Sequence, residues 1–319
     1  MTTVERSGLS EAGQVVHGHY RALLRTRRIY TLGSIGLLLV ILIGALLFAE
    51  ASNSGKFIER LPYFFDFFIH FQPDEPMEVV RAMFDLPSPY ADGSFKYDYE
   101  VGRVYVFGEF YIPEYFYQLL VTINVAFLAT LIGVVFAFPL AFLAAANATR
   151  LAPLRFAVRR VLELCRAFPE IVIAGMLVAI LSLGPIAAIV AISVHTIGAL
   201  GKMFYEVVEN ADTRPDEGLR AVGGNWFERV RFGYVPQVMP NFVSYFLLRT
   251  EINVRASTII GAVGGGGIGE VFRLSIGRDH AAKTIAIIIL LLLTIVAIDW
   301  VSGNLRRHLV GDAAFRFGG

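Results

Sequence analysis

The chain has 319 residues, 55% of them apolar and 17% charged, with a mean hydropathy of +0.60. Soluble domains contain about 45–50% apolar residues, so this composition predicts an integral membrane protein. The net charge of +1 provides no basic field that would attract nucleic acid. A single cysteine, Cys165, excludes a disulfide within the chain and a cysteine-rich metal site.

Residues 1–28 are polar and end in a cluster of arginines, directly before an apolar run at 29–48. This run is long enough to span a bilayer, and no small-residue cleavage site follows it. It therefore predicts a retained first transmembrane helix. The positive-inside rule places segment 1–28 in the cytoplasm.

Residues 49–117 are then expected on the extracytoplasmic side. The stretch 56–71 is too charged to span and too aromatic for a free loop, which favours an interfacial helix or a cover for the bundle. The stretch 94–111 alternates aromatic or β-branched residues with polar ones around Gly102. This pattern predicts a β-hairpin, either a structural cap or a contact surface for an external partner.

Residues 118–304 are predicted to form a core of five further transmembrane helices, so that the chain is an all-α integral membrane protein with six spans and an extracytoplasmic insertion. The expected spans are 118–145, 163–183, 186–204, 241–263 and 281–300. The short Gly184-Pro185 connection predicts an antiparallel pair of spans. Most of the 28 Lys and Arg residues fall in the segments placed inside, so the tail 305–319 is also expected in the cytoplasm.

The cytoplasmic segment 210–236, called the coupling segment below, predicts two short helices. Thr213 is a candidate N-cap for the first, which Gly223 and its glycine neighbour end. Asn225 can cap the second, which Gly233 and Pro236 are expected to stop.

Acidic side chains at Asp216 and Glu217 would lie at the positive end of the first helix of the coupling segment. The two helices together present apolar side chains with a charged rim, which is typical of a docking surface. The apolar members are Leu219, Val222, Trp226, Phe227 and Val230, and the rim comprises Arg220, Glu228, Arg229 and Arg231.

The fifth expected span contains Arg249, Glu251, Asn253 and Arg255. A charge facing lipid costs about 2.5–3.5 kcal/mol, so these side chains should face protein or water. Glu251 and Arg255 share one helix face as an i,i+4 pair, whereas Arg249 and Asn253 lie nearly opposite. We expect one pair to face the translocation pathway and the other a neighbouring helix; a purely structural ion pair is the alternative.

Further polar residues occur in the third and fourth spans. Arg166 and Glu170 flank Pro169 at i,i+4 spacing, and His195 lies in the next span. These residues could line the same pathway, although a lone buried histidine is more often only hydrogen-bonded. No metal-ligand set surrounds His195.

The glycine-rich stretch 261–270 follows a predicted helix instead of a strand and has no Gly-Lys-Ser/Thr, so it does not fit a phosphate loop. Its glycines would allow close helix packing and a hinge near an outer gate. The candidate gate residues are Gly261, Gly264, Gly265, Gly266, Gly267 and Gly269.

The coupling segment also resembles the Glu-Ala-Ala loop of ABC importer permeases, with Glu217, Gly223 six residues later and Pro236 at the expected spacing. Both alanines are replaced, by Gly218 and Leu219. The residues expected to contact an ATPase are Glu217, Gly218, Leu219, Ala221, Gly223, Trp226, Phe227 and Pro236. Further stretches at 166–170, 195–209, 233–269 and 298–307 are similar to the phosphonate importer permeases of the binding-protein-dependent inner-membrane permease family.

This resemblance implies a type I importer fold in the cell inner membrane, and a homodimer that works with two copies of a cytoplasmic ATPase and an extracytoplasmic substrate-binding protein. ATP and Mg would bind the ATPase, and no cofactor is expected to bind this chain. Because the chain has no Walker motif, it is not expected to be an enzyme. The implied substrate is a phosphonate or a related phosphorus oxyanion. An importer for another small solute such as phosphate, phosphite or an amino acid, a secondary transporter and a membrane scaffold are the alternatives.

Overall fold

The computed structural model divides the chain into two compact units, residues 1–71 and 72–319, which are described separately. The residues it describes are 11–49, 62–63, 65–66, 69, 72–73, 75–86, 104–106, 110–182, 184–277 and 281–310. Most of the expected interfacial helix at 56–71, and residues 94–103 of the expected hairpin, lie outside these residues.

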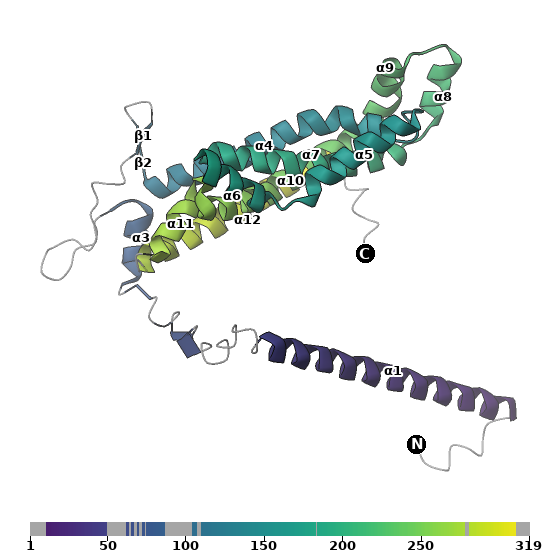
Figure 1. Cartoon of the computed structure of the whole chain (residues 1–319), viewed down its shortest axis with the longest axis horizontal. Helices are drawn as coiled ribbons and strands as arrows, with labels where there is room; N and C mark the ends of the chain where they lie inside the picture. Colours follow the sequence, from purple (N-terminus) through teal and green to yellow (C-terminus); the bar gives the residue numbers. More distant parts are fainter. Residues whose placement is uncertain are drawn as a thin grey trace, which may run out of the picture. The chain divides into compact units, whose positions relative to one another are not determined.

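The first unit contains one long helix, α1 (Glu11–Ala49), in which the expected span at 29–48 lies (Figure 1). Its stretch Leu23–Phe48 has a mean hydropathy of 2.6 and is long enough to cross a membrane. The helix begins well before the apolar run and includes the basic residues that precede it.

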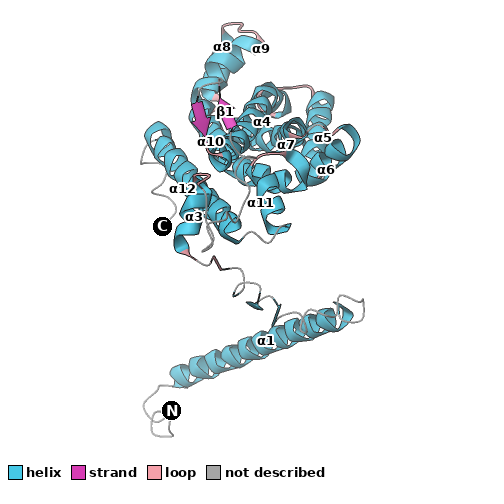
Figure 2. Cartoon of the chain, turned by 90° about the vertical axis from the view of Figure 1, so that its left-hand side faces the viewer, coloured by secondary structure: helices cyan, strands magenta, loops and turns pink. Residues whose placement is uncertain are grey.

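The second unit is a helical bundle (Figures 1 and 2). Its helices are α4 (Glu114–Ala144), α5 (Ala152–Ala167), α6 (Glu170–Leu181), α7 (Pro185–Glu209), α10 (Val235–Ile260), α11 (Ile268–Gly277) and α12 (Ala281–Val310). Within the described residues of the whole chain, four helices can cross a membrane by length and composition. There are six candidate spans if the bent pairs, one bent by 72° after Ala167 and one by 59° before Ile268, each count as one.

The third span differs from the continuous helix expected at 163–183. The chain forms an amphipathic helix, α5, and then α6, which begins at Glu170. Phe168 has extended dihedral angles (φ −86°, ψ 133°) because the following Pro169 disfavours the helical region in its neighbour and lacks an N–H. Arg166 and Glu170 therefore lie on different helices, not on one face of one helix.

Small residues allow the helices at the centre of the bundle to pack closely. One core cluster contains Ala129, Ala174, Ala188 and Ala191 from α4, α6 and α7. Gly133 lies so close to the side chain of Thr196 that an added Cβ would collide with it. Small residues let membrane helices approach each other where apolar burial alone provides little driving force.

A second core lies toward the end of α7. It is built around aromatic side chains of α4, α7 and α10, among them Phe142, Phe204 and Phe242. The Phe204 and Phe242 rings stack with their centroids 3.9 Å apart. Such aromatic pairs contribute about 0.5–1.5 kcal/mol beyond their buried area, so this cluster holds α7 and α10 together beside the coupling segment.

The opposite end of the bundle carries α3 (Pro76–Met83) and the strands that belong to the expected insertion. Helix α3 packs against α4, α11 and α12. The expected β-hairpin is present as β1 (Val104–Val106) and β2 (Phe110–Ile112), with Val104 opposite Ile112. This pairing places the connection after Val106 and not around Gly102. β-Branched and aromatic residues face each other across the two strands, and such cross-strand pairs stabilise a hairpin.

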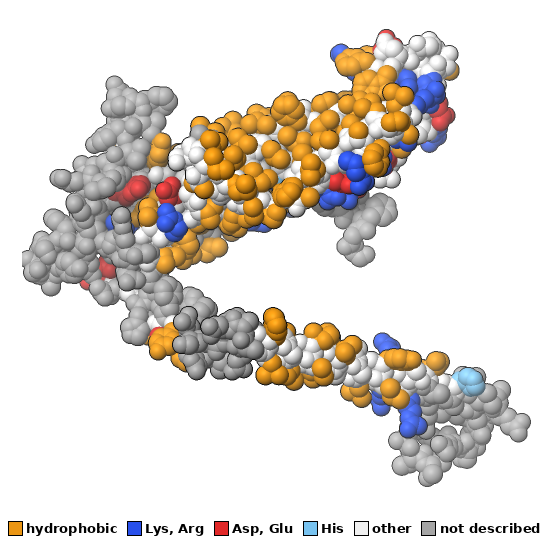
Figure 3. Space-filling view, in the orientation of Figure 1, with side chains coloured by type: hydrophobic (Ala, Val, Ile, Leu, Met, Phe, Trp, Pro, Cys, Tyr) orange, Lys and Arg blue, Asp and Glu red, His pale blue; other side chains and the backbone are white. Residues whose placement is uncertain are grey.

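The bundle has two distinct ends. Figure 1 shows the coupling helices α8 (Arg214–Ala221) and α9 (Trp226–Glu228) at one end and α3 with the hairpin at the other. Apolar side chains cover most of the bundle face between them in Figure 3, while Lys and Arg gather toward the end that carries α8 and α9. An apolar band between charged ends is the surface that a bilayer requires.

Candidate functional site

The coupling segment contains α8 (Arg214–Ala221), α9 (Trp226–Glu228) and the π-helical turn η4 (Arg229–Tyr234). Asn225 caps α9 as predicted, since its side chain accepts from the Glu228 N–H at 3.0 Å and its own N–H donates to the Glu228 carboxylate at 2.8 Å. Gly223 separates the helices with φ of +83°, which a residue with a Cβ adopts only with strain.

Thr213 does not cap α8 although the helix begins where expected. The backbone of Thr213 is itself near-helical (φ −83°, ψ −15°), so its side chain cannot reach the free N–H groups of the first turn. The Thr213 hydroxyl instead donates to the Glu217 carboxylate at 3.0 Å.

The second helix of the coupling segment does not stop at Gly233 and Pro236. It continues through η4 into α10, and Pro236 lies in the first turn of α10. Pro236 has no N–H to donate to the preceding turn. The wider π-turn before it keeps the helix continuous, with the Val235 N–H donating to the Val230 carbonyl five residues earlier. The second helix of the coupling segment, α9, is therefore continuous with the fifth span.

Asp216 is the centre of the coupling segment and is 1% exposed. Its carboxylate accepts from Arg229 at 2.5 and 3.1 Å, and Arg220 lies at 2.6 Å. Asp216 is therefore not a solvent-facing charge at a helix end, and Arg229, expected on the rim, is buried. Val230, expected on the apolar surface, is also buried because its helix turns inward toward α10.

The side chains that remain exposed define a smaller docking surface, formed by Val222, Trp226 and Phe227. Val222 is 82% exposed, Phe227 64% and Trp226 39%. The predicted contact residues Glu217, Gly218 and Ala221 are exposed beside them, while Leu219 is half-buried against Gly233. Exposed large apolar side chains on a polar segment mark a protein interaction site.

Hydrogen bonds connect the coupling segment to the loop between α4 and α5. The Trp226 indole donates to the Ala148 carbonyl at 3.2 Å, and Arg220 and Tyr234 both donate to the Asn147 carbonyl at 3.3 Å. The docking surface is therefore connected to the loop before α5 as well as to α10. These loop residues carry no sequence signal, because only their backbone carbonyls take part.

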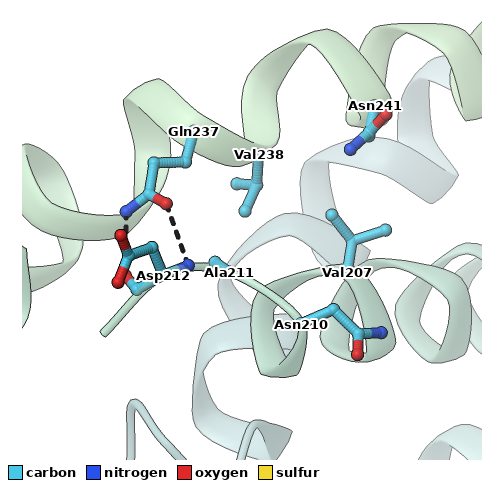
Figure 4. A pocket seen from close by; sticks show the side chains of 7 residues that line it. All are labelled: Val207, Asn210, Ala211, Asp212, Gln237, Val238 and Asn241. Carbon is cyan, nitrogen blue, oxygen red and sulfur yellow. Dashed lines mark hydrogen bonds between the residues drawn. The ribbon is translucent and has the colours of Figure 1, made fainter. Parts of the chain in front are cut away.

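A second connection borders a cavity of about 400 Å³ beside the coupling segment (Figure 4). The Gln237 amide accepts from the Asp212 N–H at 3.0 Å and donates to the Asp212 carbonyl at 3.1 Å and the Gly233 carbonyl at 2.6 Å. Figure 4 shows this amide reaching from α10 to the end of α7. It fixes the entry of the coupling segment against the base of the fifth span.

Glu251 and Arg255 do not pair with each other, which was the alternative to one pair of span residues facing a neighbouring helix. Glu251 pairs with Arg306 at 2.6 Å, and Arg255 pairs with Asp299 at 2.7 Å. Both partners belong to α12, which packs along this face of α10 and presents the opposite charges to each. Glu251 and Arg255 therefore serve a helix contact.

Arg249 and Asn253 lie on the other face, toward α4 and α7. Asn253 is fully buried and its amide donates to Thr130 at 2.8 Å and to Thr196 at 3.0 Å. The Arg249 Nε donates to the same Thr196 hydroxyl at 3.3 Å. This polar cluster sets the position of the Arg249 guanidinium at the centre of the bundle.

Arg249 borders a cavity of about 320 Å³ between α5, α7 and α10, called the cation-lined cavity below. It brings together three residues of the predicted pathway, Arg166, His195 and Arg249. The lining residues are Arg166, His195, Ala199, Lys202, Met203, Leu248, Arg249 and Ile252. Lys202 was not predicted as a pathway residue. Its position two helix turns after His195, on the same helix face, could have indicated that it lines the same cavity.

The cations of the cavity are only weakly neutralised. Lys202 lies 3.5 Å from Glu206 on its own helix. Among the described residues, Arg166 has no ion pair or hydrogen bond. Glu170 approaches His195, with 3.3 Å between its carboxylate and Nδ1. An arrangement of guanidinium and ammonium groups without matched carboxylates attracts a small anion.

The predicted gate glycines form the bend between α10 and α11, which includes the π-turn η5 (Gly261–Gly265). Gly264, Gly266 and Gly267 have positive φ. The bend packs against α4, where the Ile268 N–H donates to the Thr122 hydroxyl at 3.0 Å. Gly269 contacts the Thr258 carbonyl so closely that a Cβ would collide with it, so glycine is required where α11 folds back on α10.

Residues 133–311 match the family model described as "Binding-protein-dependent transport system inner membrane component", which covers more than half of the chain. The chain belongs to this family. The match extends from α4 to the end of α12 and includes the coupling segment, the cation-lined cavity and the glycine bend.

Curated relatives in the family carry transport names. The phosphate-import permease PhnE of Mycolicibacterium smegmatis is 33% identical over 59% of this chain and 36% of its own length. The phosphite transport system permease PtxC of Stutzerimonas stutzeri is 36% identical over 60% of this chain and 69% of its own length. The putative cryptic phosphonate transport permease PhnE2 of Escherichia coli K12 is 41% identical over 38% of this chain and 98% of its own length.

The fold also matches a solved structure of the inward-facing MetNI methionine ABC transporter, with a TM-score of 0.54 and 22% identity over 61% of this chain and 95% of that one. The fold of this inner-membrane component is thus the fold of a type I ABC importer permease. At this identity the likeness establishes the fold and not the solute.

Proposed function

We propose that the chain is the permease subunit of an ATP-driven importer for phosphonates or a related phosphorus oxyanion. The cation-lined cavity carries this proposal, because Arg166, Lys202 and Arg249 offer charge-assisted hydrogen bonds to P–O oxygens. Relatives named for phosphate, phosphite and phosphonate transport support the same chemistry. The likeness to a methionine transporter does not favour an amino acid, since it concerns the fold alone.

The proposed importer contains two copies of this chain, two copies of a cytoplasmic ATPase and an extracytoplasmic binding protein. ATP and Mg bind the ATPase, which contacts the docking surface of Val222, Trp226 and Phe227. Both termini lie in the cytoplasm, and the hairpin end of the bundle faces the binding protein.

In the proposed cycle, closure of the ATPase dimer displaces the docking surface. The hydrogen bonds of Trp226 and Arg220 pass the movement to α5, while the continuous helix from η4 passes it to α10. Arg166 at the end of α5 and Arg249 on α10 would then change their separation, which opens or closes the cation-lined cavity. The glycine bend between α10 and α11 serves as the outer gate.

ATP hydrolysis by the complex of this chain, its ATPase and its binding protein in lipid discs tests the proposal. Methylphosphonate, 2-aminoethylphosphonate, phosphite, phosphate and methionine are supplied in turn. We expect stimulation by a phosphorus oxyanion and none by methionine. Stimulation by methionine alone would contradict the substrate class, and failure of the ATPase to co-purify would contradict the coupling assignment.

The coupling assignment has a separate test in Glu217→Ala. Glu217 is exposed, and its described side-chain contact is with the Thr213 hydroxyl, so the fold should be retained. We expect uptake to be lost while the binding protein still captures substrate. The matched control is Arg214→Gln on the same helix, whose side chain is 86% exposed and contacts Asp212. Unchanged uptake by Glu217→Ala would reject the role of this residue in coupling.

A further inference from the structure

Glu170 is an acidic residue that contacts His195, one of the residues lining the cation-lined cavity. It is the first residue of α6, directly after the 72° bend, where the positive end of the helix stabilises a carboxylate. Its carboxylate lies 3.3 Å from His195 Nδ1, and the side chain is 26% exposed.

His195 is oriented toward this carboxylate by its surroundings. Its Nδ1 lies 3.3 Å from the Phe168 carbonyl as well as from Glu170. A carbonyl oxygen only accepts, so Nδ1 carries the hydrogen in its contact with Phe168. The Glu170 carboxylate lies at ion-pair distance from the same nitrogen.

A phosphorus oxyanion is stabilised by the same groups as the Glu170 carboxylate, namely hydrogen-bond donors and cationic side chains. Three cations in a partly enclosed cavity would hold such an anion strongly if no competing charge were present. A pathway must release its substrate, so a fixed anion that competes for the same groups lowers the affinity to a useful range.

We propose that the Glu170 carboxylate is the resident counter-anion of the cation-lined cavity, and that an incoming phosphorus oxyanion displaces it from His195. The inference rests on the proposed function and assigns the residue that sets affinity within the pathway. Return of the carboxylate to His195 would then accompany release of the substrate toward the cytoplasm.

Glu170→Gln tests this inference because it keeps the shape of the side chain and removes its charge. Equilibrium binding of radiolabelled phosphate and methylphosphonate is measured on the permease–ATPase complex in lipid discs without the binding protein. We expect binding about tenfold tighter than in the wild type and a lower maximal uptake rate, because release becomes slow. Glu170→Asp, which keeps the charge on a shorter side chain, should lie between the two.

Glu163→Gln is the matched control, since Glu163 lies one turn before Arg166 and pairs with Arg160 outside the cavity. Its anion binding should equal that of the wild type. Unchanged binding in Glu170→Gln, or loss of assembly in both Glu170 variants, would overturn the counter-anion role and leave Glu170 a structural residue. Failure of the wild-type complex to import any phosphorus oxyanion would instead reject the proposed function.

Discussion

Two buried charges in this protein are treated in opposite ways. Asp216 in the coupling segment is 1% exposed and has two arginines at 2.5–3.1 Å. Arg249 in the fifth span is 8% exposed and has a neutral hydroxyl at 3.3 Å, with no described carboxylate at ion-pair distance.

The difference separates a charge that stabilises the fold, Asp216, from a charge that remains available to bind a ligand, Arg249. Removing a charge from water costs several kcal/mol unless close partners replace the solvent. Asp216 has those partners, so it fixes the coupling helices. Arg249 borders the cation-lined cavity, so hydration or an entering anion can supply the missing partner.

The largest expected effect is that of Asp216→Asn. This change leaves the Arg220 and Arg229 guanidiniums without their carboxylate, and breaking a buried ion pair costs about 3–5 kcal/mol. We expect a strongly lowered unfolding temperature in lipid discs and loss of the ATPase on purification. Asp212→Asn, an exposed carboxylate in the same segment, is the control and should retain the ATPase. Equal stability of the two variants would show that the buried cluster does not hold the segment.

Arg249→Gln should separate stability from transport. Since Arg249 has few matched partners, its removal should barely change the unfolding temperature. Uptake should fall about tenfold or more, because a charge-assisted hydrogen bond to the substrate contributes about 1.5–3 kcal/mol. Arg255→Gln, which breaks the pair with Asp299 on α12, is the comparison and should leave uptake near the wild-type rate. A reversed order of the two would place the pathway on the α12 side.

A smaller and opposite effect is expected for Gly218→Ala in the coupling segment. A Cβ added to Gly218 has nothing within 4 Å, and alanine favours a helix over glycine by about 0.5–1 kcal/mol. The unfolding temperature should rise slightly with ATPase binding retained. Loss of ATPase binding would show that the partner packs directly against this glycine. Gly133→Ala, where the Cβ collides with Thr196, should instead lower stability.

The smallest effect concerns Asp212 and pH. The Arg214 backbone N–H, and then its side chain, hold the pKa of the Asp212 carboxyl below its ordinary value of 3.8. The stabilisation is therefore present above this value and is lost as the pH falls through the lowered pKa. Unfolding temperatures of wild type and Asp212→Asn should differ slightly at neutral pH and converge once the pH is below the lowered pKa of Asp212. A difference that persists there would assign the effect to packing.

Sequence reasoning succeeded where neighbouring residues decide the outcome. The Asn225 cap depends on Glu228 three residues away, and the turn at Gly223 depends on its own missing Cβ. The extended backbone at Phe168 follows from Pro169 in the same way, although the pattern of apolar residues had suggested an unbroken span. Pro236 was wrongly expected to stop the second helix. A π-turn before the proline lets the helix continue without the missing N–H, and no residue pattern predicts such a turn.

The sequence by itself determined that the chain is a helical membrane protein, that segment 210–236 resembles the Glu-Ala-Ala loop of importer permeases, and that charges interrupt its fifth span. Hydropathy and local capping depend on residues close together in the chain. Only the tertiary structure decided which charges pair: Glu251 with Arg306 and Arg255 with Asp299, each across to α12, while Arg249 was left facing the cation-lined cavity. Helix packing set these partners, because residues far apart in sequence meet only when the helices assemble.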